Sequence, residues 1–121
     1  MPFIIFFRGD PGVGKSILAC QLGKSLKVTV LDYDDIKGPL VNRLSPDILP
    51  RLSYDIAENI LMSNIKMGLD IVFDSHGYYR EFFDKCVSIA GYENVIIINC
   101  ICSDHSCPVK NPTTMPVLTV L

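Results

Sequence analysis

The chain has 121 residues, 49% of them hydrophobic, and a formal net charge of −2 at pH 7. This length suits one domain with one core, and the near-neutral charge gives neither a broad basic surface for nucleic acid nor a charged tail typical of disorder. The N-terminal run Met1–Phe7 lacks the basic lead and cleavage site of a signal peptide. Five cysteines in a chain without an export signal are typical of reduced thiols, so we expect a cytoplasmic protein.

The first two predicted elements are a strand and a helix. A continuous apolar run at Phe3–Phe7 is typical of a strand that is covered on both faces. Behind it, Leu18, Leu22 and Leu26 lie four residues apart, which predicts the core face of a helix over residues 15–26. Cys20 is expected on the same core face.

Strand-like and helix-like spacing continue to alternate through residue 101. The further predicted elements are a strand at 27–31, a helix from an N-cap at Ser53 to Gly68, a strand at 69–73, a helix over 82–90 and a strand at 94–101. This order predicts a three-layer α/β fold, in which helices flank a mostly parallel sheet.

The sequence changes character after Cys102. We therefore predict a domain over residues 1–102, followed by an irregular tail over 103–121 that contains three prolines. A short strand at 117–121 and a loose segment are both compatible with the last residues.

The stretch between the first strand and the first helix reads GDPGVGKS and fits Gly-x-x-x-x-Gly-Lys-Ser, the Walker A or P-loop pattern. Its glycines let the backbone approach a phosphate closely, and the following helix directs N–H groups at the anion. Lys15 adds a positive charge, and the Ser16 hydroxyl is a hard ligand for Mg²⁺. The predicted nucleotide-binding residues are Gly9, Asp10, Pro11, Gly12, Val13, Gly14, Lys15, Ser16 and Ile17.

Carboxylates follow the second and third predicted strands. Asp74 ends the third strand, where P-loop proteins place a carboxylate near Mg²⁺, although an aspartate that merely starts a surface turn is the alternative. After the second strand, Asp32, Asp34 and Asp35 repel one another, which raises the proton affinity of at least one and suits a general base. The alternative is a solvated acidic start of a short helix.

Three stretches, GDPGVGKS, LDYDDIK and IVFDSHGYYRE, together give a narrower signal. Over residues 3–102 the chain resembles the small P-loop kinases that include zeta toxins, chloramphenicol phosphotransferase and the kinase domain of polynucleotide kinase. Such proteins are grouped with the AAA-type ATPase-like domains of the P-loop NTPase superfamily. The resemblance implies that the third strand lies between the first and second.

The resemblance also implies roles for individual residues. It makes Lys15 and Asp34 catalytic, assigns acceptor binding to Asp34, Lys37 and Arg80, and assigns Mg²⁺ to Ser16 and Asp74. Lys37 stands where relatives carry an arginine, so it keeps the charge but loses the two-pronged hydrogen bonding.

The family continues with a lid helix that carries arginines. This sequence has no arginine after Arg80, so we expect a truncated version in which the lid region is missing. The expected function is phosphoryl transfer from Mg·ATP to a hydroxyl acceptor, with nucleic acid as a partner only in that acceptor role. A non-catalytic nucleotide-binding module and a simple ATP hydrolase remain alternatives.

Overall fold

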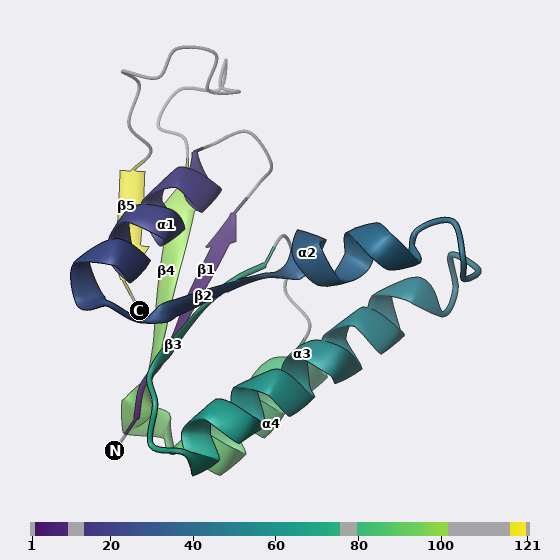
Figure 1. The fold of residues 1–121 in the computed structure, drawn as a ribbon. Coiled ribbons are helices and arrows are strands. Elements are labelled where there is room, and N and C mark those ends of the chain that lie inside the picture. Colours follow the sequence, from purple (N-terminus) through teal and green to yellow (C-terminus); the bar gives the residue numbers. More distant parts are fainter. Residues whose placement is uncertain (1, 10–13, 76–79, 102–116, 121) are drawn as a thin grey trace.

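The computed structural model of the protein describes residues 2–9, 14–75, 80–101 and 117–120. Figure 1 shows how its elements are arranged. Along the chain they are β1 (Ile4–Gly9), α1 (Lys15–Leu26), β2 (Thr29–Asp32), α2 (Tyr33–Lys37), the 3₁₀ helix η1 (Gly38–Leu40), α3 (Leu49–Lys66), β3 (Ile71–Asp74), α4 (Arg80–Ala90), the 3₁₀ helix η2 (Tyr92–Asn94), β4 (Val95–Ile101) and β5 (Val117–Val120).

The strands form a five-stranded sheet in the order β2-β3-β1-β4-β5. Strands β1 to β4 are mutually parallel, and β3 lies between β1 and β2 as the resemblance implied. β5 is antiparallel to β4, with Val117 opposite Ile101. Of the two alternatives left open for the last residues, the structure has the short strand, at residues 117–120, where β-branched residues favour it. Residues 103–116 of the predicted tail lie outside the described part.

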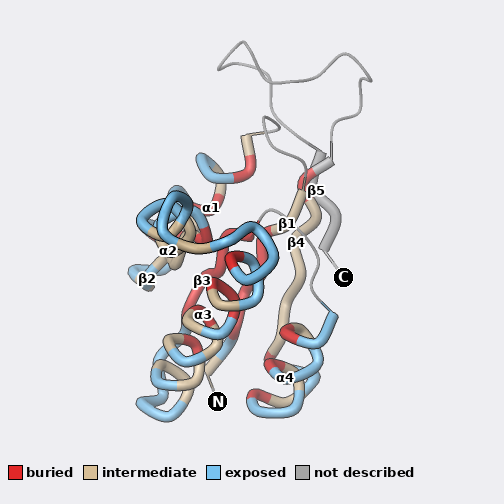
Figure 2. Tube along the Cα trace, turned by 90° about the vertical axis from the view of Figure 1, so that its right-hand side faces the viewer, coloured by how far each residue is buried: buried red, intermediate tan, exposed pale blue. Residues whose placement is uncertain are grey.

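Helices cover both faces of the sheet, which gives the predicted three layers (Figures 1 and 2). Because side chains alternate along a strand, Ile4 and Phe6 of β1 face one way and Ile5 and Phe7 the other. The first pair packs against α2, α3 and α4, and the second pair packs against α1. This two-sided burial is the reason for the unbroken apolar run of β1.

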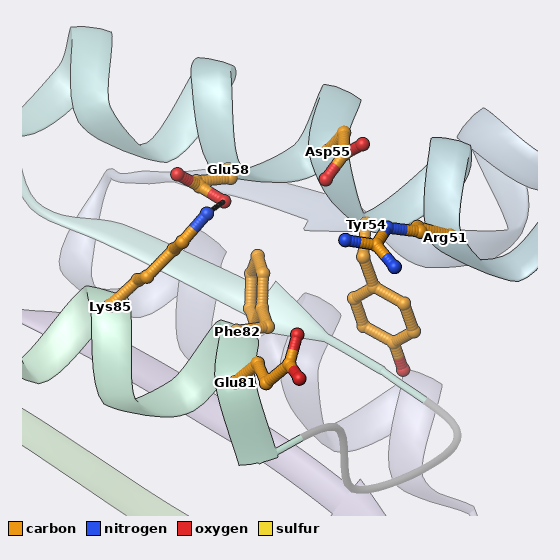
Figure 3. Close-up of a pocket in the computed structure, with 7 residues that line it drawn as sticks. All are labelled: Arg51, Tyr54, Asp55, Glu58, Glu81, Phe82 and Lys85. Carbon is orange, nitrogen blue, oxygen red and sulfur yellow. Dashed lines mark hydrogen bonds and ion pairs between the residues drawn. The ribbon is translucent and has the colours of Figure 1, made fainter.

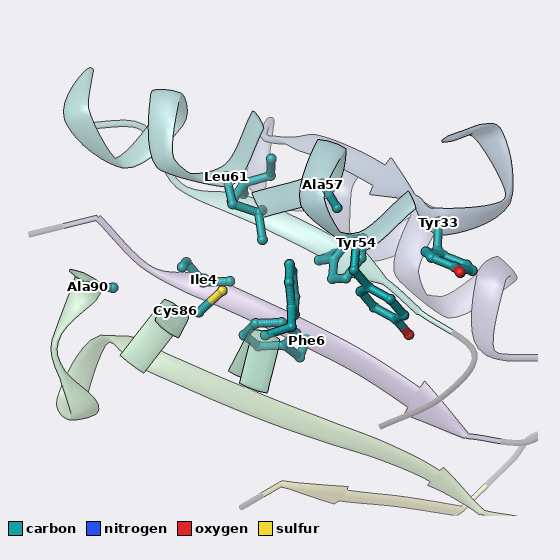
Figure 4. Close-up of a cluster of buried hydrophobic side chains, with 11 residues drawn as sticks. Ile4, Phe6, Tyr33, Tyr54, Ala57, Leu61, Cys86 and Ala90 are labelled. Carbon is teal, nitrogen blue, oxygen red and sulfur yellow. The ribbon is translucent and has the colours of Figure 1, made fainter. Parts of the chain in front are cut away.

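Aromatic side chains hold α2, α3 and α4 to their face of the sheet (Figure 4). The Phe6 ring lies edge-on to Phe73 and Phe82, with centroids 5.9 and 6.0 Å apart. Tyr54 of α3 continues the cluster at 5.2 Å from Phe82 and stacks at 4.6 Å on Tyr33 of α2. The short helix α2, which follows β2 directly, is thereby fixed to α3.

Helix α3 begins one turn earlier than predicted. Ser53 is not its N-cap but a buried interior residue, whose hydroxyl donates to the carbonyl oxygen of Leu49 at 2.7 Å. Pro50 does not prevent the earlier start, because proline fits the first turn, where no intrahelical N–H bond is needed. The helix ends at Lys66, just before Gly68, as predicted.

Helix α1 faces the sheet with a different stripe from the one predicted. Lys15, Ala19 and Gly23, spaced four apart, are its buried residues, and Leu18 and Leu22 pack beside them. The predicted core residues Leu26 and Cys20 are exposed instead. None of the helices in the described ranges combines the length and the apolar character that crossing a membrane requires.

Candidate functional site

The candidate site lies where β1, β2 and β3 end. Phe7 of β1 and Asp32 of β2 are both opposite Asp74 of β3 in the parallel register. The amide of Ser75 donates to the carbonyl oxygen of Phe7 at 3.0 Å, which ties the end of β3 to β1. Ligands of open parallel sheets bind outside this edge, and the predicted site residues around Asp74 follow these strands.

Two glycines bound the turn from β1 to α1, and the structure requires glycine at both positions. A side chain on Gly9 would overlap the carbonyl oxygen of Cys100 on the neighbouring strand β4. Gly14 is the N-cap of α1 with φ 84° and ψ 14°, a left-handed conformation that glycine adopts without strain. Of the predicted phosphate-binding residues, 10–13 lie outside the described ranges.

Lys15, Ser16 and Asp74 meet at this edge and form what we call the Asp74 cluster. The Lys15 ammonium forms an ion pair and hydrogen bond with Oδ1 of Asp74. The Ser16 hydroxyl donates to Oδ2 of the same carboxylate at 2.7 Å. The Lys15 and Asp74 side chains are only 4% and 2% exposed, so the pair is shielded from water. Asp74 is therefore not the start of a surface turn.

The Asp74 cluster has the donor types that a phosphate–Mg²⁺ site needs. The oxygens of Ser16 and Asp74 are hard ligands of the kind that Mg²⁺ prefers, and Lys15 carries the charge for a phosphate. Within the described ranges no three His, Cys, Asp or Glu side chains gather around a common point. Mg²⁺ usually takes only one or two carboxylates and completes its shell with water and phosphate oxygens, so these two residues suit it. Ile17 follows on α1 and is 59% exposed.

Cys100 of β4 lies close to the Asp74 cluster, a neighbour that the sequence did not point to. Its side chain is buried, and burial raises the pKa of the thiol. The Lys15 cation opposes this pKa shift, and the Asp74 carboxylate adds to it. The signal that would have identified it is the β1–β4 register, in which Cys100 lies opposite Gly9.

The acidic segment, residues 32–37, begins at the carboxyl end of β2. Asp32 is the N-cap of α2, and its Oδ1 accepts a hydrogen bond from the Asp34 amide at 2.8 Å. Partial burial raises the pKa of Asp32, and the negative charges of Asp74, Asp34 and Asp35 raise it further. The hydrogen bond from the Asp34 amide acts in the opposite direction and lowers the pKa. The predicted rise in proton affinity thus falls on Asp32, while Asp34 and Asp35 are exposed in the first turn of α2.

The two predicted acceptor cations lie on different helices. Lys37 is the last residue of α2, and Arg80 is the first residue of α4. Arg80 is largely exposed and pairs with Asp84 of its own helix at 3.7 Å. Among the described residues, Arg80 thus forms its ion pair within its own helix and not with the acidic segment.

A small cavity lies between α3 and α4 beside the site (Figure 3). It is lined by Arg51, Tyr54, Asp55, Glu58, Glu81, Phe82 and Lys85. Its volume of about 30 Å³ is room for ordered water. Tyr54 nevertheless connects it to the sheet edge, because the Tyr54 hydroxyl shares a hydrogen bond with Ser75, the residue after Asp74. A larger apolar cavity of about 310 Å³ lies at the opposite end of β4, around Val95 and Tyr92, and does not belong to the site.

No family model and no curated protein matches the chain. Solved structures do match its fold. A candidate kinase from Chloroflexus aurantiacus J-10-fl aligns with a TM-score of 0.62 at 24% identity, over 84% of this chain and 60% of the other. A gluconokinase from Sinorhizobium meliloti 1021 aligns with a TM-score of 0.60 at 17% identity, over 79% of this chain and 55% of the other. A chain of the Pnkp1/Rnl/Hen1 RNA repair complex aligns with a TM-score of 0.59 at 18% identity, over 81% of this chain and 32% of the other.

The fold is that of the P-loop kinases. The match extends over about four-fifths of this chain in each case. The chain spans 60% or less of the length of these structures. At 24% identity and below, the similarity establishes the fold and leaves activity, substrate and partners to the chemistry of the site.

Proposed function

We propose that the protein binds Mg·ATP at the turn between β1 and α1 and transfers the terminal phosphoryl group to a hydroxyl-bearing acceptor. The observation that carries this proposal is the convergence of Lys15, Ser16 and Asp74 directly behind a glycine-bounded turn. The kinase-like fold supports it independently.

On the nucleotide side, each residue of the Asp74 cluster has a task. Lys15 pairs with the phosphates, and the N–H groups of the first turn of α1, which have no partner within the helix, are proposed to donate to the same anion. Ser16 and Asp74 hold Mg²⁺ through their oxygens. When bound, Mg²⁺ neutralises charge on the phosphates. Residues 9–17 together form the nucleotide-binding segment of the proposal.

On the acceptor side, Asp34 is the proposed general base. It takes the proton of the acceptor hydroxyl while the acceptor oxygen attacks the terminal phosphorus, and the bond to the bridging oxygen breaks to release ADP. The exposure of Asp34 in the first turn of α2 lets an acceptor reach it without disturbing the core. Lys37 and Arg80 are proposed to contact the acceptor.

The acceptor class is proposed only as hydroxyl-bearing. The name of one matched structure, gluconokinase, points to a small polyhydroxy acceptor, and an RNA repair complex points to a nucleic-acid end. We also propose a cytoplasmic location, since the described cysteines Cys20, Cys86 and Cys100 are free thiols.

Calorimetric titration with Mg·ATP tests nucleotide binding. Wild type and Lys24→Ala, a matched change of a lysine in the last turn of α1, are expected to bind alike. Lys15→Ala is expected to weaken binding by about 10- to 150-fold, because a hydrogen bond to a charged group is worth about 1.5–3 kcal/mol. Circular dichroism checks that the variant is folded. Wild-type affinity in folded Lys15→Ala contradicts the proposal.

Turnover with labelled ATP then separates the possible activities. Label that moves to an added polyol or to a 5′-hydroxyl oligonucleotide, with stoichiometric ADP, supports the kinase. Acceptor-independent phosphate release indicates a hydrolase, and tight binding without turnover indicates a non-catalytic module.

A further inference from the structure

Asp74 binds both of the side chains that the proposed nucleotide site needs, Lys15 and Ser16. Its Oδ1 is paired with the Lys15 ammonium, and its Oδ2 accepts the Ser16 hydroxyl at 2.7 Å. The carboxylate is 2% exposed and the lysine 4% exposed, so solvent does not weaken their attraction. In this arrangement the Lys15 ammonium, which is proposed to bind phosphate, and the Ser16 hydroxyl, which is proposed to bind the metal, are both bonded to Asp74.

The backbone of Asp74 is fixed, so this arrangement can change only through side chains. Asp74 lies opposite Phe7 on one side and Asp32 on the other, and the Ser75–Phe7 hydrogen bond of 3.0 Å closes the ladder just beyond it. Lys15, in contrast, lies in the first turn of α1 and reaches Asp74 through four flexible methylenes. The lysine side chain is the part that can turn toward a different anion.

Binding of a metal-free phosphate at this site requires Lys15 to exchange its partner Asp74 for the phosphate, and this exchange is unfavourable. If Lys15 leaves Asp74 for the phosphate, it leaves a buried carboxylate without its counter-ion, which is strongly destabilising. That carboxylate also repels the incoming phosphate across a short distance in a water-poor setting. A divalent cation removes both problems, because it replaces Lys15 as the counter-charge of Asp74.

We infer that Asp74 closes the phosphate site to metal-free nucleotides, and that a divalent cation opens it by replacing Lys15 on the carboxylate. This inference rests on the proposed nucleotide site and adds a regulation to it. The contact between Lys15 and Asp74 thus makes binding of phosphate and cation mutually dependent. Ser16 changes partner in the same exchange, from Asp74 to the cation.

Asp74→Asn tests this mechanism, because it removes the negative charge and keeps the shape. Binding of pyrophosphate and of ATP is measured by calorimetry with excess EDTA and with Mg²⁺, for wild type, Asp74→Asn and the exposed control Asp47→Asn. In wild type and the control, Mg²⁺ is expected to strengthen ATP binding by about 5- to 150-fold, the usual range of coupling between two sites. In Asp74→Asn, metal-free binding is expected to become at least about ten-fold tighter than in wild type, because a like charge is gone.

A thermal readout accompanies the titrations and does not depend on activity. Asp74→Asn is expected to unfold at a lower temperature than wild type, since Lys15 loses its buried counter-ion. Metal-free pyrophosphate is expected to raise the unfolding temperature of Asp74→Asn by more than it raises that of wild type. If Asp74→Asn does not fold, Asp74→Ser is the second variant, and the Mg²⁺ dependence of wild type is measured in either case.

The outcomes distinguish this inference from the proposed function. If Asp74→Asn binds metal-free pyrophosphate and ATP no more tightly than wild type, while wild type binds Mg·ATP, the inference is wrong and the nucleotide site stands. Equal wild-type affinity with EDTA and with Mg²⁺ also overturns it. If no variant binds ATP under either condition, both proposals fail.

Discussion

The Asp74 cluster and the acidic segment lie at the carboxyl ends of neighbouring strands, yet they differ in burial and in pairing. In the Asp74 cluster, Lys15 and Asp74 are buried and bonded to each other. In the acidic segment, Asp34 and Asp35 are exposed and Asp32 is only partly buried. Asp32 and Asp74 themselves are direct partners in the β2–β3 register.

The difference suits two kinds of ligand. The Asp74 carboxylate is buried at the end of a core strand and keeps one position, as a site for a constant phosphate group and its cation requires. Exposed charges on a five-residue helix cost little to rearrange, as a site that receives a second substrate requires. We therefore expect changes in the Asp74 cluster to affect folding and nucleotide binding, and changes in the acidic segment to affect transfer.

The largest expected effect is on transfer. Asp34→Asn removes the proposed base and is expected to slow phosphoryl transfer by about 10²–10⁴-fold, the usual contribution of general acid–base catalysis. ATP affinity is expected to stay unchanged, because Asp34 belongs to the acceptor side. Transfer rates with the acceptor found by labelled-ATP turnover, and calorimetry with Mg·ATP, provide the two measurements.

Asp35→Asn is the matched control, since Asp35 is the exposed neighbour in the same helix. Normal transfer by Asp34→Asn, or equal losses in both variants, contradicts the assignment of the base to Asp34.

The next effect is on stability. Asp74→Ala leaves the buried Lys15 ammonium without its counter-ion, and the expected loss is about 3–5 kcal/mol in the free energy of unfolding. Asp34→Ala, an exposed change, is expected to stay within about 0.5 kcal/mol of wild type. Urea unfolding of both variants measures the contrast, and equal losses remove the distinction between the two regions.

A smaller effect is expected at the cap of α2. Asp32→Ala loses the hydrogen bond to the Asp34 amide and is expected to destabilise the protein by about 1 kcal/mol, whereas Asp32→Asn keeps a good N-cap and is expected to recover most of the loss. Transfer activity in Asp32→Ala is expected to fall with KM for the acceptor raised, because Asp34 is displaced with the helix start. No rescue by Asp32→Asn contradicts the capping role.

The smallest effect is a pH dependence. The pKa of Asp32 is raised above its ordinary 3.8 in the folded protein, so the folded state holds this proton more tightly than the unfolded chain. The stabilisation that comes from the tighter binding of this proton is therefore fully present below pH 3.8, and it is lost as the pH rises through the raised pKa of Asp32. The stability of wild type minus that of Asp32→Asn is expected to fall with rising pH over this range in urea unfolding. A difference that grows with pH contradicts the sign of the shift.

The fold was predictable because its signals are local. The apolar run of β1, the glycine-bounded turn behind it and the alternation of spacing up to residue 101 are visible in the sequence, and the β2-β3-β1 order came from the resemblance. The helix start at Ser53 was mispredicted because a serine before an apolar stripe fits both an N-cap and an interior position that bonds back to Leu49. Cys20 was mispredicted because the sheet-facing stripe of α1 includes Lys15 and Gly23, which are not apolar markers.

The site was only partly predictable, since its contacts join distant segments. The sequence placed Lys15, Ser16 and Asp74 at one edge, but their mutual bonds depend on the β1–β3 register and on the length of the lysine side chain. The position of Cys100 behind Gly9 depends on the β1–β4 register in the same way.

Backbone amide chemical shifts test the phosphate-binding turn most directly. Mg·ATP is titrated into ¹⁵N-labelled wild-type protein, and shift changes are followed along the chain. The largest changes are expected on residues 9–17 and around Asp74, with small changes in the second half of α3. Saturable changes that centre on the cavity between α3 and α4, while Gly14, Lys15 and Ser16 stay unperturbed, would contradict it.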